Sequence, residues 1–362
     1  MQKKLSVGWA FLVVMPVILP FLWPNLVMAQ SNKLFSKDTV NPNYIELIDT
    51  LANARLYVSQ KLTSPTLLSK DGNHAVRYRT NGPTNLGFGG TYGWATLNIG
   101  LNFKFINHDN DIYGKSKFLD LHGSGIGKTY FVDFFGQFYK GVYLMPESGE
   151  KLPDGVPYPT RPDIYTQKIG LTAWYMPNWR KYSYAAAANQ RDWQKKSAGS
   201  LLLGWGIFSG KIQGDSSLIP KDRAAYFTHP EINKLSFFEL SAGAGYGYTL
   251  VINQHFFAAA SFTASLSGGI SNQFAGENKS GDVYFKPNYL FRPSIGYNGP
   301  NFNASVMLFA YQLNAGDETS YRITTTNLRF TVAHRLLPKA KAKKALDKLM
   351  KVNPRWKKQY NL

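Results

Sequence analysis

Residues 240–252 read LSAGAGYGYTLVI, residues 256–270 read FFAAASFTASLSGGI, and these two stretches decide the fold. In both, large apolar residues alternate with small ones, which places the apolar side chains on one face of an extended chain. The even positions include Leu240, Tyr246, Phe262 and Leu266, whereas the odd positions are mostly Gly, Ser and Thr. Residues 95–105, ATLNIGLNFKF, repeat the alternation. All three stretches therefore predict β-strands with one apolar face.

The length of these strands favours a membrane protein over a soluble one. The three stretches span 11, 13 and 15 residues, whereas soluble strands usually have about 5–6 residues and a tilted membrane strand needs roughly 9–11. A soluble β-sandwich is the alternative, because its inner faces are also apolar. However, the apolar face carries no charge, and the other face is small enough to line a narrow lumen. We therefore predict an all-β fold, a transmembrane antiparallel β-barrel.

Fourteen segments qualify as strands of this barrel. They lie near residues 53–63, 72–80, 84–92, 95–105, 116–125, 129–140, 164–176, 181–190, 199–213, 240–252, 256–270, 283–297, 302–313 and 321–336. The preferred count is 14 strands, and it becomes 12 if two short N-terminal segments are not separate strands. Both counts are even, as expected for a barrel of this kind. Counting back from a last strand that ends in the periplasm puts the long segment 141–162 there, against the rule that periplasmic turns are short.

The N-terminus predicts export. Lys3 and Lys4 precede an apolar run, and Val27 and Ala29 are the small residues that a signal peptidase requires. A retained transmembrane helix is the alternative, but three prolines interrupt the run, and each removes a helix hydrogen bond. We predict an outer-membrane protein of a Gram-negative cell, with a signal peptide cleaved after Ala29. The predicted parts are the signal peptide (1–29), an N-terminal periplasmic segment (30–52), the barrel (53–336) and a basic tail (337–362).

The basic tail holds much of the chain's charge. From Arg335 to Leu362 there are ten Lys or Arg residues and one acid, out of a net charge of +19. The body is therefore only mildly basic, and nucleic-acid binding is not predicted. Between Pro338 and Pro354 we expect a short basic amphipathic helix. A face that carries Lys341, Lys344, Lys348 and Lys351 would rest on anionic lipid or bind a periplasmic protein, and a frayed tail is the alternative.

Composition excludes several other classes. The absence of Cys rules out a lipoprotein anchor, disulfides, thiol catalysis and Cys-based metal sites. No mature stretch reaches 18 apolar residues, which excludes a polytopic helical membrane protein. The six His residues are scattered without a metal-ligand spacing. We therefore predict no metal site and no cofactor.

Charged residues on the small-residue face are the main functional candidates. If the alternation holds, seven of them point into the lumen, where a charge must be paired or hydrated. They either pair into a plug that closes a rigid barrel, or they line a pore for small polar solutes. The seven residues are Lys104, Asp120, Asp133, Lys168, Glu239, Arg292 and Arg329.

Two motifs suggest chemistry but have simpler interpretations. Residues 123–129, GSGIGKT, resemble a phosphate-binding loop, but His122 stands where the pattern needs Gly, and a strand follows instead of a helix. A hairpin turn is the better reading. His122 and Ser124, two positions apart on one strand face, could form the base and nucleophile of a lipid hydrolase. No oxyanion donor is identifiable, so we predict that the chain is not an enzyme.

Several segments resemble a known family. They include Asn43-Tyr44-Ile45, Tyr78-Arg79-Thr80-Asn81, Arg161-Pro162-Asp163, Gln194-Lys195-Lys196-Ser197-Ala198-Gly199-Ser200 and Gly296-Tyr297-Asn298-Gly299. Together these resemble a Bacteroidetes-type exported outer-membrane family catalogued as domain of unknown function 4421. The resemblance spans roughly residues 40–336 and leaves the basic tail outside. It implies no catalytic residue, because the family has no assigned reaction or ligand.

Three functional hypotheses follow from the sequence. The first is a narrow pore or solute-binding channel in contact with outer-membrane lipid and a small polar solute. The second is a structural or assembly barrel that anchors periplasmic partners through its basic tail. The third, and least favoured, is an outer-membrane lipid hydrolase.

Overall fold

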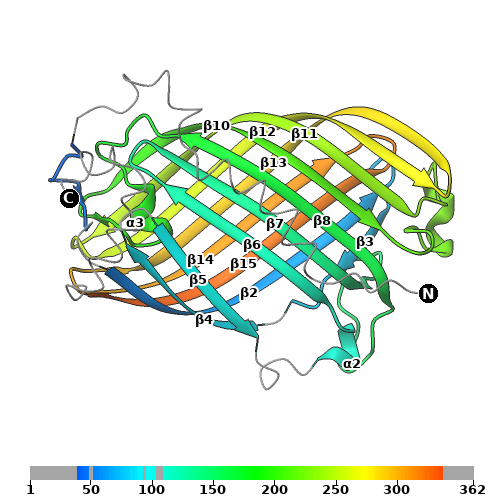
Figure 1. Cartoon of the computed structure of the whole chain (residues 1–362), viewed down its shortest axis with the longest axis horizontal. Coiled ribbons are helices and arrows are strands. Elements are labelled where there is room, and N and C mark those ends of the chain that lie inside the picture. Colours follow the sequence, from blue (N-terminus) through cyan, green and yellow to red (C-terminus); the bar gives the residue numbers. More distant parts are fainter. Residues whose placement is uncertain (1–38, 49–51, 83, 93–94, 103–108, 337–362) are drawn as a thin grey trace, which may run out of the picture. The chain divides into compact units, whose positions relative to one another are not determined.

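The computed structural model describes residues 39–48, 52–82, 84–92, 95–102 and 109–336. Strands dominate, and they are β1 (Ile45–Glu46), β2 (Ala52–Leu68), β3 (Ala75–Arg79), β4 (Thr84–Tyr92), β5 (Ala95–Asn102), β6 (Lys117–Ile126), β7 (Tyr130–Leu144), β8 (Thr160–Tyr175), β9 (Trp193–Gln194), β10 (Ala198–Gln213), β11 (Lys234–Ile252), β12 (Phe256–Ala275), β13 (Asn278–Asn298), β14 (Phe302–Ala315) and β15 (Ser320–Leu336). The helices are α2 (Asn110–Tyr113), α3 (Tyr184–Ala188) and the 3-10 helix η2 (Lys221–Tyr226). Figure 1 shows the long strands running side by side.

Ten strands of the described chain close into a ring, which confirms the antiparallel barrel. Its order is β15, β14, β13, β12, β11, β10, β8, β7, β3 and β2, and β15 pairs with β2 to complete it. Three further strands extend the sheet, β4 and β5 from β2, and β6 from β7. The sheet therefore has 13 strands, but only ten of them close the barrel, whereas 12 to 14 barrel strands were predicted.

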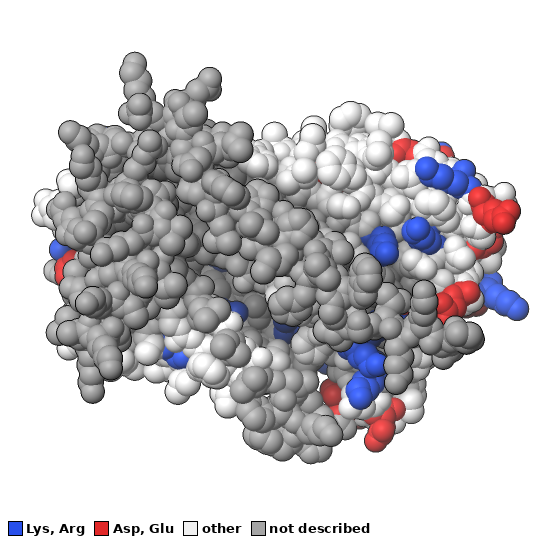
Figure 2. Space-filling model, in the orientation of Figure 1, with Lys and Arg blue, Asp and Glu red and all other residues white. Residues whose placement is uncertain are grey.

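The two faces of the sheet differ as the alternation predicts. On β11 and β12 the even positions point outward, and Leu240 and Leu266 are 57% and 61% exposed. The odd positions point inward, where Ser267 is buried. Apolar side chains on the outside of a closed sheet are stable only against lipid, because apolar surface is driven out of water. Figure 2 shows charged side chains gathered toward the right-hand end, beside a white surface without charged residues.

Two long connections lie together at one end of the barrel, here called the η2 end. They are residues 145–159 and 214–233, the second of which contains η2. The opposite end, here called the α3 end, holds a third long connection, residues 176–197, together with the short turns at 253–255 and 299–301 and with Ala52 and Leu336, where the barrel strands begin and end. The segment 141–162 is therefore not at the end where the last strand stops, and the count that placed it there was wrong.

The miscount arose at residues 181–190, which were predicted as a strand but contain α3. Residues 184–188 read YAAAA, and Ala has the highest helix propensity. The Ser183 side chain caps the helix by accepting a hydrogen bond from the Ala186 amide. None of the helices in the described ranges is long and apolar enough to span a membrane.

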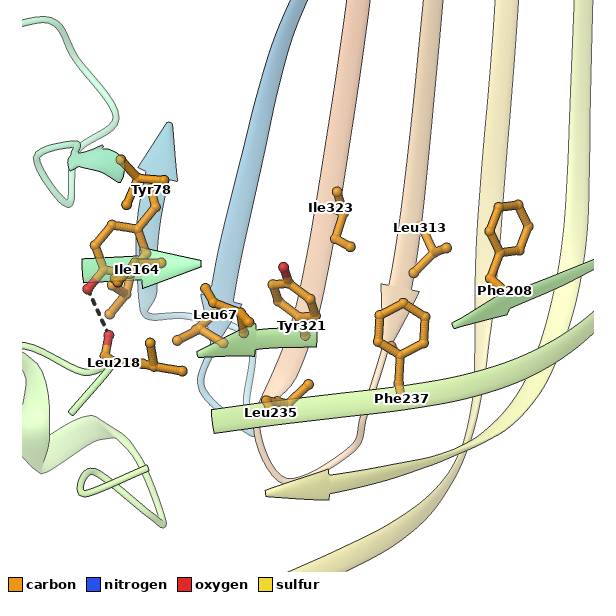
Figure 3. Packing of buried hydrophobic residues seen from close by; sticks show 14 of the residues in the cluster. Leu67, Tyr78, Ile164, Phe208, Leu218, Leu235, Phe237, Leu313, Tyr321 and Ile323 are labelled. Carbon is orange, nitrogen blue, oxygen red and sulfur yellow. Dashed lines mark hydrogen bonds between the residues drawn. The ribbon is translucent and has the colours of Figure 1, made fainter. Parts of the chain in front are cut away.

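A hydrophobic cluster fills the barrel at the η2 end. Tyr78, Tyr321 and Phe237 point inward from the wall, and Tyr78 points toward Leu218 of the 214–233 connection (Figure 3). The Tyr78 hydroxyl donates a hydrogen bond to the Leu218 carbonyl over 2.9 Å. The buried Arg223 guanidinium donates to the Ala75 carbonyl, also over 2.9 Å. The connection thus folds against the inside of the wall at this end.

Candidate functional site

A buried ion pair crosses the lumen between opposite walls. Asp133 lies on β7 and Arg292 on β13, five places apart in the ring of ten, so the two strands face each other. Arg292 Nη2 donates to Asp133 Oδ2 over 2.5 Å, and the Asp133 side chain is fully buried. Arg292 Nη1 also donates to the Tyr184 hydroxyl of α3 over 2.9 Å. One guanidinium therefore joins both walls and the helix inside the barrel.

Ser124 and His122 contact the same carboxylate. The Ser124 hydroxyl donates to Asp133 Oδ1 over 2.5 Å, and His122 Nε2 lies 3.7 Å from that oxygen. A hydrolytic triad needs the His between Ser and Asp, so that the His can take the Ser proton. Here the carboxylate is the centre, and Arg292 already neutralises it. The arrangement suits a structural ion cluster better than an activated nucleophile.

A second polar cluster surrounds Asp120. Lys61 Nζ lies 2.6 Å from Asp120 Oδ1, and the Tyr139 hydroxyl donates to Asp120 Oδ2 over 2.5 Å. Tyr139 in turn accepts from the Thr63 hydroxyl over 3.2 Å. The sequence analysis missed Lys61. The signal was available, because Lys61 shares its strand face with Tyr57 and Thr63 and alternates with outward Leu62.

Lys168 reaches across the barrel among aromatic rings. Its Nζ lies 3.4 Å from the Thr325 hydroxyl on β15, four places away in the ring. The same ammonium lies 4.9 Å from the Tyr311 ring centre and 5.6 Å from that of Phe135. Phe208 from β10 stacks on Tyr311 with centres 5.5 Å apart. Side chains from β7, β8, β10, β14 and β15 therefore meet at one level of the lumen.

Glu239 and Arg329 complete the predicted inward set within the described chain. Glu239 is fully buried and accepts hydrogen bonds from the Tyr284 hydroxyl and the Asn288 amide over 2.9 and 2.7 Å. The Arg329 guanidinium lies 4.6 Å from the Tyr57 ring centre. Lys104 and the tail residues Lys341, Lys344, Lys348 and Lys351 lie outside the described residues, as does the predicted cleavage site after Ala29.

The connection between β8 and β10, residues 176–197 and here called the insert, occupies the α3 end. Its Arg191 donates to the Ile126 carbonyl, and its Trp193 ring donates to the Gln254 carbonyl over 2.7 Å. From the wall, Arg335 donates to the Gln190 carbonyl over 2.9 Å, and the Asn298 side chain donates to the Asp192 carbonyl over 3.0 Å. These hydrogen bonds reach four separate parts of the barrel, so they fix the insert in the opening of the barrel at the α3 end.

The insert also joins the chain's N-terminal segment and leaves little space beside the wall. β9 of the insert pairs with β1, and Ile45 of β1 is buried. A small cavity, of about 20 Å³ for the centre of a water molecule, lies between α3 and the wall near Arg292 and Ser294. That volume fits about one water molecule and not a larger solute. Among the described residues no group of three His, Asp or Glu could hold a metal ion.

Comparisons with known proteins give a family and a set of distant barrels. The family described as Domain of unknown function (DUF4421) matches residues 36–335. No curated protein matches the sequence. The outer membrane protease OmpT from Escherichia coli is 11% identical, with 83% of this chain and 99% of that chain covered and a TM-score of 0.35.

Two other solved barrels are more distant still. Neisserial surface protein A is 7% identical, with 76% of this chain and 96% of that chain covered and a TM-score of 0.22. The P. putida toluene transporter TodX is 6% identical, with 79% and 90% covered and a TM-score of 0.23.

Proposed function

The chain belongs to the family described as Domain of unknown function (DUF4421), and we propose that it serves as a closed, non-conducting barrel that anchors partners at the outer membrane. The observation that carries the closed, non-conducting barrel is the Asp133–Arg292 ion pair across the lumen. An open pore needs water between its walls, whereas here opposite walls share a 2.5 Å contact. The insert adds a second closure at the α3 end.

The outer face supports a membrane location. Rows of exposed apolar residues cover β11, β12 and β13, and Val283 and Phe285 are 70% and 71% exposed. A signal peptide cleaved after Ala29 would deliver the chain to the periplasm, from which barrels insert. Because the first and last strands of such barrels typically begin and end in the periplasm, we place the α3 end, where Ala52 and Leu336 lie, in the periplasm and the η2 end outside.

Planar-bilayer recording tests the closure. The wild-type protein, inserted at a density confirmed by recovery of the protein from the bilayer, is expected to give no stepwise current. Stepwise currents from the wild-type chain would overturn the closed barrel. Deletion of residues 338–362 tests the anchoring role. It should leave the barrel folded but remove the periplasmic proteins that co-purify with the full chain, and unchanged co-purification would contradict a role for the tail.

A gated channel is the second candidate, and the position of the insert favours it. The insert contacts the wall through hydrogen bonds as well as through apolar contacts of Tyr182 and Tyr184, and a water-sized cavity lies behind it next to Arg292. Its departure would expose a polar lumen to small solutes. A variant with residues 179–196 replaced by a Gly-Ser linker should then conduct. Replacing Lys104 or Arg292 should change its current if these residues line the path, and a silent deletion variant would exclude this candidate.

A further inference from the structure

One outward row of residues crosses six neighbouring strands near the η2 end. Each member is the register partner of the next, from β7 to β8, β10, β11, β12 and β13. Lys211 lies on the same outer face of β10, two residues before Gln213, the residue that β10 contributes to the row. The row consists of Lys140, Tyr165, Gln213, Lys234, Phe274 and Lys279.

The row lies directly beyond the edge of the apolar surface. Four residues along β11 from Lys234, Phe238 points outward and pairs with Ile270, which pairs with Val283. These three side chains are 44%, 52% and 70% exposed. Lipid tails cover such side chains, and lipid head groups lie where the apolar surface ends. The lysines are therefore at head-group level when the barrel is in a membrane.

Three ammonium groups, those of Lys211, Lys234 and Lys279, converge on aromatic rings of the row. Lys234 Nζ and Lys279 Nζ lie 4.5 and 5.9 Å from the centre of the same ring, that of Phe274. Lys211 Nζ lies 5.3 Å from the ring centre of Tyr165. Within the described ranges no carboxylate lies within 4.0 Å of these three lysines, whereas Lys286 on β13 is 3.7 Å from Asp317. Like charges that share a ring repel each other, and a bound anion would relieve that repulsion.

We propose that Lys211, Lys234 and Lys279, with Lys140 at the edge, bind the phosphate groups of anionic membrane lipids in the leaflet at the η2 end. The inference rests on the membrane location proposed above. The flanking Tyr165 and Phe274 rings lie between the lysines, where they can pack against the glycerol or sugar part of a head group. The apolar edge next to the row holds the acyl chains, so the site fits a lipid better than a free anion.

Native mass spectrometry of the detergent-solubilised full chain tests this site. Phosphatidylglycerol should be retained in preference to phosphatidylcholine, and inorganic phosphate should not displace it. The triple variant K211Q/K234Q/K279Q should lose affinity for phosphatidylglycerol by roughly five-fold per Lys, since each Lys contributes about 1 kcal/mol of binding free energy near a lipid surface. The charge-matched control K70Q/K151Q/K221Q, on the connections of the same end, should bind like the wild type.

The arginine variant K211R/K234R/K279R keeps the charges and should retain binding. Three results would each overturn the proposal. They are an equal loss of phosphatidylglycerol affinity in the K211Q/K234Q/K279Q and control variants, no preference of the wild type for phosphatidylglycerol, and displacement of the lipid by inorganic phosphate. Quenching of Trp205 by brominated lipid, measured on the same preparation returned to vesicles, separates the two levels of failure. If Trp205 is quenched but the protein shows no preference for phosphatidylglycerol, only the lipid site is excluded. If Trp205 is not quenched, the membrane location on which the site rests is excluded as well.

Discussion

Asp133 and Arg292 are 159 residues apart in the sequence, yet their side chains meet at 2.5 Å inside the lumen, beside the insert. The pair is fixed by its surroundings, because Ser124 donates to the carboxylate and Tyr184 accepts from the guanidinium. The Phe309 ring centre lies 4.7 Å from the guanidinium carbon. This contact ties β7, β13 and the insert into one unit and closes the space that a pore would need.

Breaking this pair should destabilise the barrel strongly. Arg292→Met leaves the Asp133 charge buried without a partner, which costs about 3–5 kcal/mol of unfolding free energy. The double variant D133N/R292M should lose less than the sum of the single variants, because neither charge then remains. Urea unfolding from phospholipid vesicles, followed by tryptophan fluorescence, measures both.

Lys286→Met is the matched control for that cycle. Lys286 lies on the same strand, but its partner Asp317 is 3.7 Å away and more than half exposed. An exposed pair contributes about 0–1 kcal/mol. Additive losses for Asp133 and Arg292, or a loss no larger than that of the control, would show that the cross-lumen pair does not hold the walls together.

A charged residue introduced on the outer face should lower the unfolding free energy more, the deeper it lies in the lipid bilayer. Leu266→Arg, in the middle of β12, should lower the unfolding free energy by about 2–4 kcal/mol. Asn272→Arg, on the same face but near the η2 end, should cost about 0–1 kcal/mol. The comparison uses folding into vesicles. Equal effects at the two positions would mean that lipid does not cover this face.

The connection 145–159 should hold Glu147 ionised to lower pH than usual. His74 Nδ1 lies 2.9 Å from Glu147 Oε1, and this hydrogen bond is the main reason that the pKa of Glu147 is lowered from 4.5. Because the folded pKa is depressed, the stabilisation is present above 4.5 and is lost as the pH falls through the folded pKa. Carboxyl NMR titration should find a raised pKa for Glu147 in His74→Ala. An unchanged pKa would exclude this hydrogen bond as the cause.

Ser124→Ala should leave phospholipid hydrolysis unchanged. The Ser124 hydroxyl is bonded to Asp133 and not to a His that could take its proton. The substitution should instead lower the unfolding free energy by about 1.5–3 kcal/mol, the usual worth of a hydrogen bond to a charged group. Fatty-acid release from mixed micelles is the measurement. Hydrolysis by the wild type that disappears in the variant would establish an enzyme.

The sequence was most informative where strands are regular. The rows that include Leu240 and Leu266 predicted the barrel and its outer face, because strict alternation leaves one arrangement of the side chains. The insert was not predictable as a plug. Four consecutive Ala residues after Tyr184 fit either a strand or a helix when only apolar character is counted, and the Ser183 cap decides between them.

The partners of the inward charges also lay beyond the sequence. Alternation indicates that Asp133 and Arg292 share the inner face, but not that β7 and β13 stand opposite each other. That relation depends on the number of strands that close the ring. Since three strands extend the sheet without closing it, counting strands along the chain gives the wrong opposite pairs.

Fluorescence quenching by lipids brominated along their acyl chains tests the central claim most directly. Trp205 points outward and is 52% exposed, whereas Trp174 points inward and is 4% exposed. Two variants, each retaining one of these residues with the other Trp residues replaced by Phe, are folded into brominated vesicles. Strong quenching of Trp205 with little quenching of Trp174 is the predicted result. Equal quenching of both, or quenching of neither, would contradict a closed barrel whose outer face meets lipid.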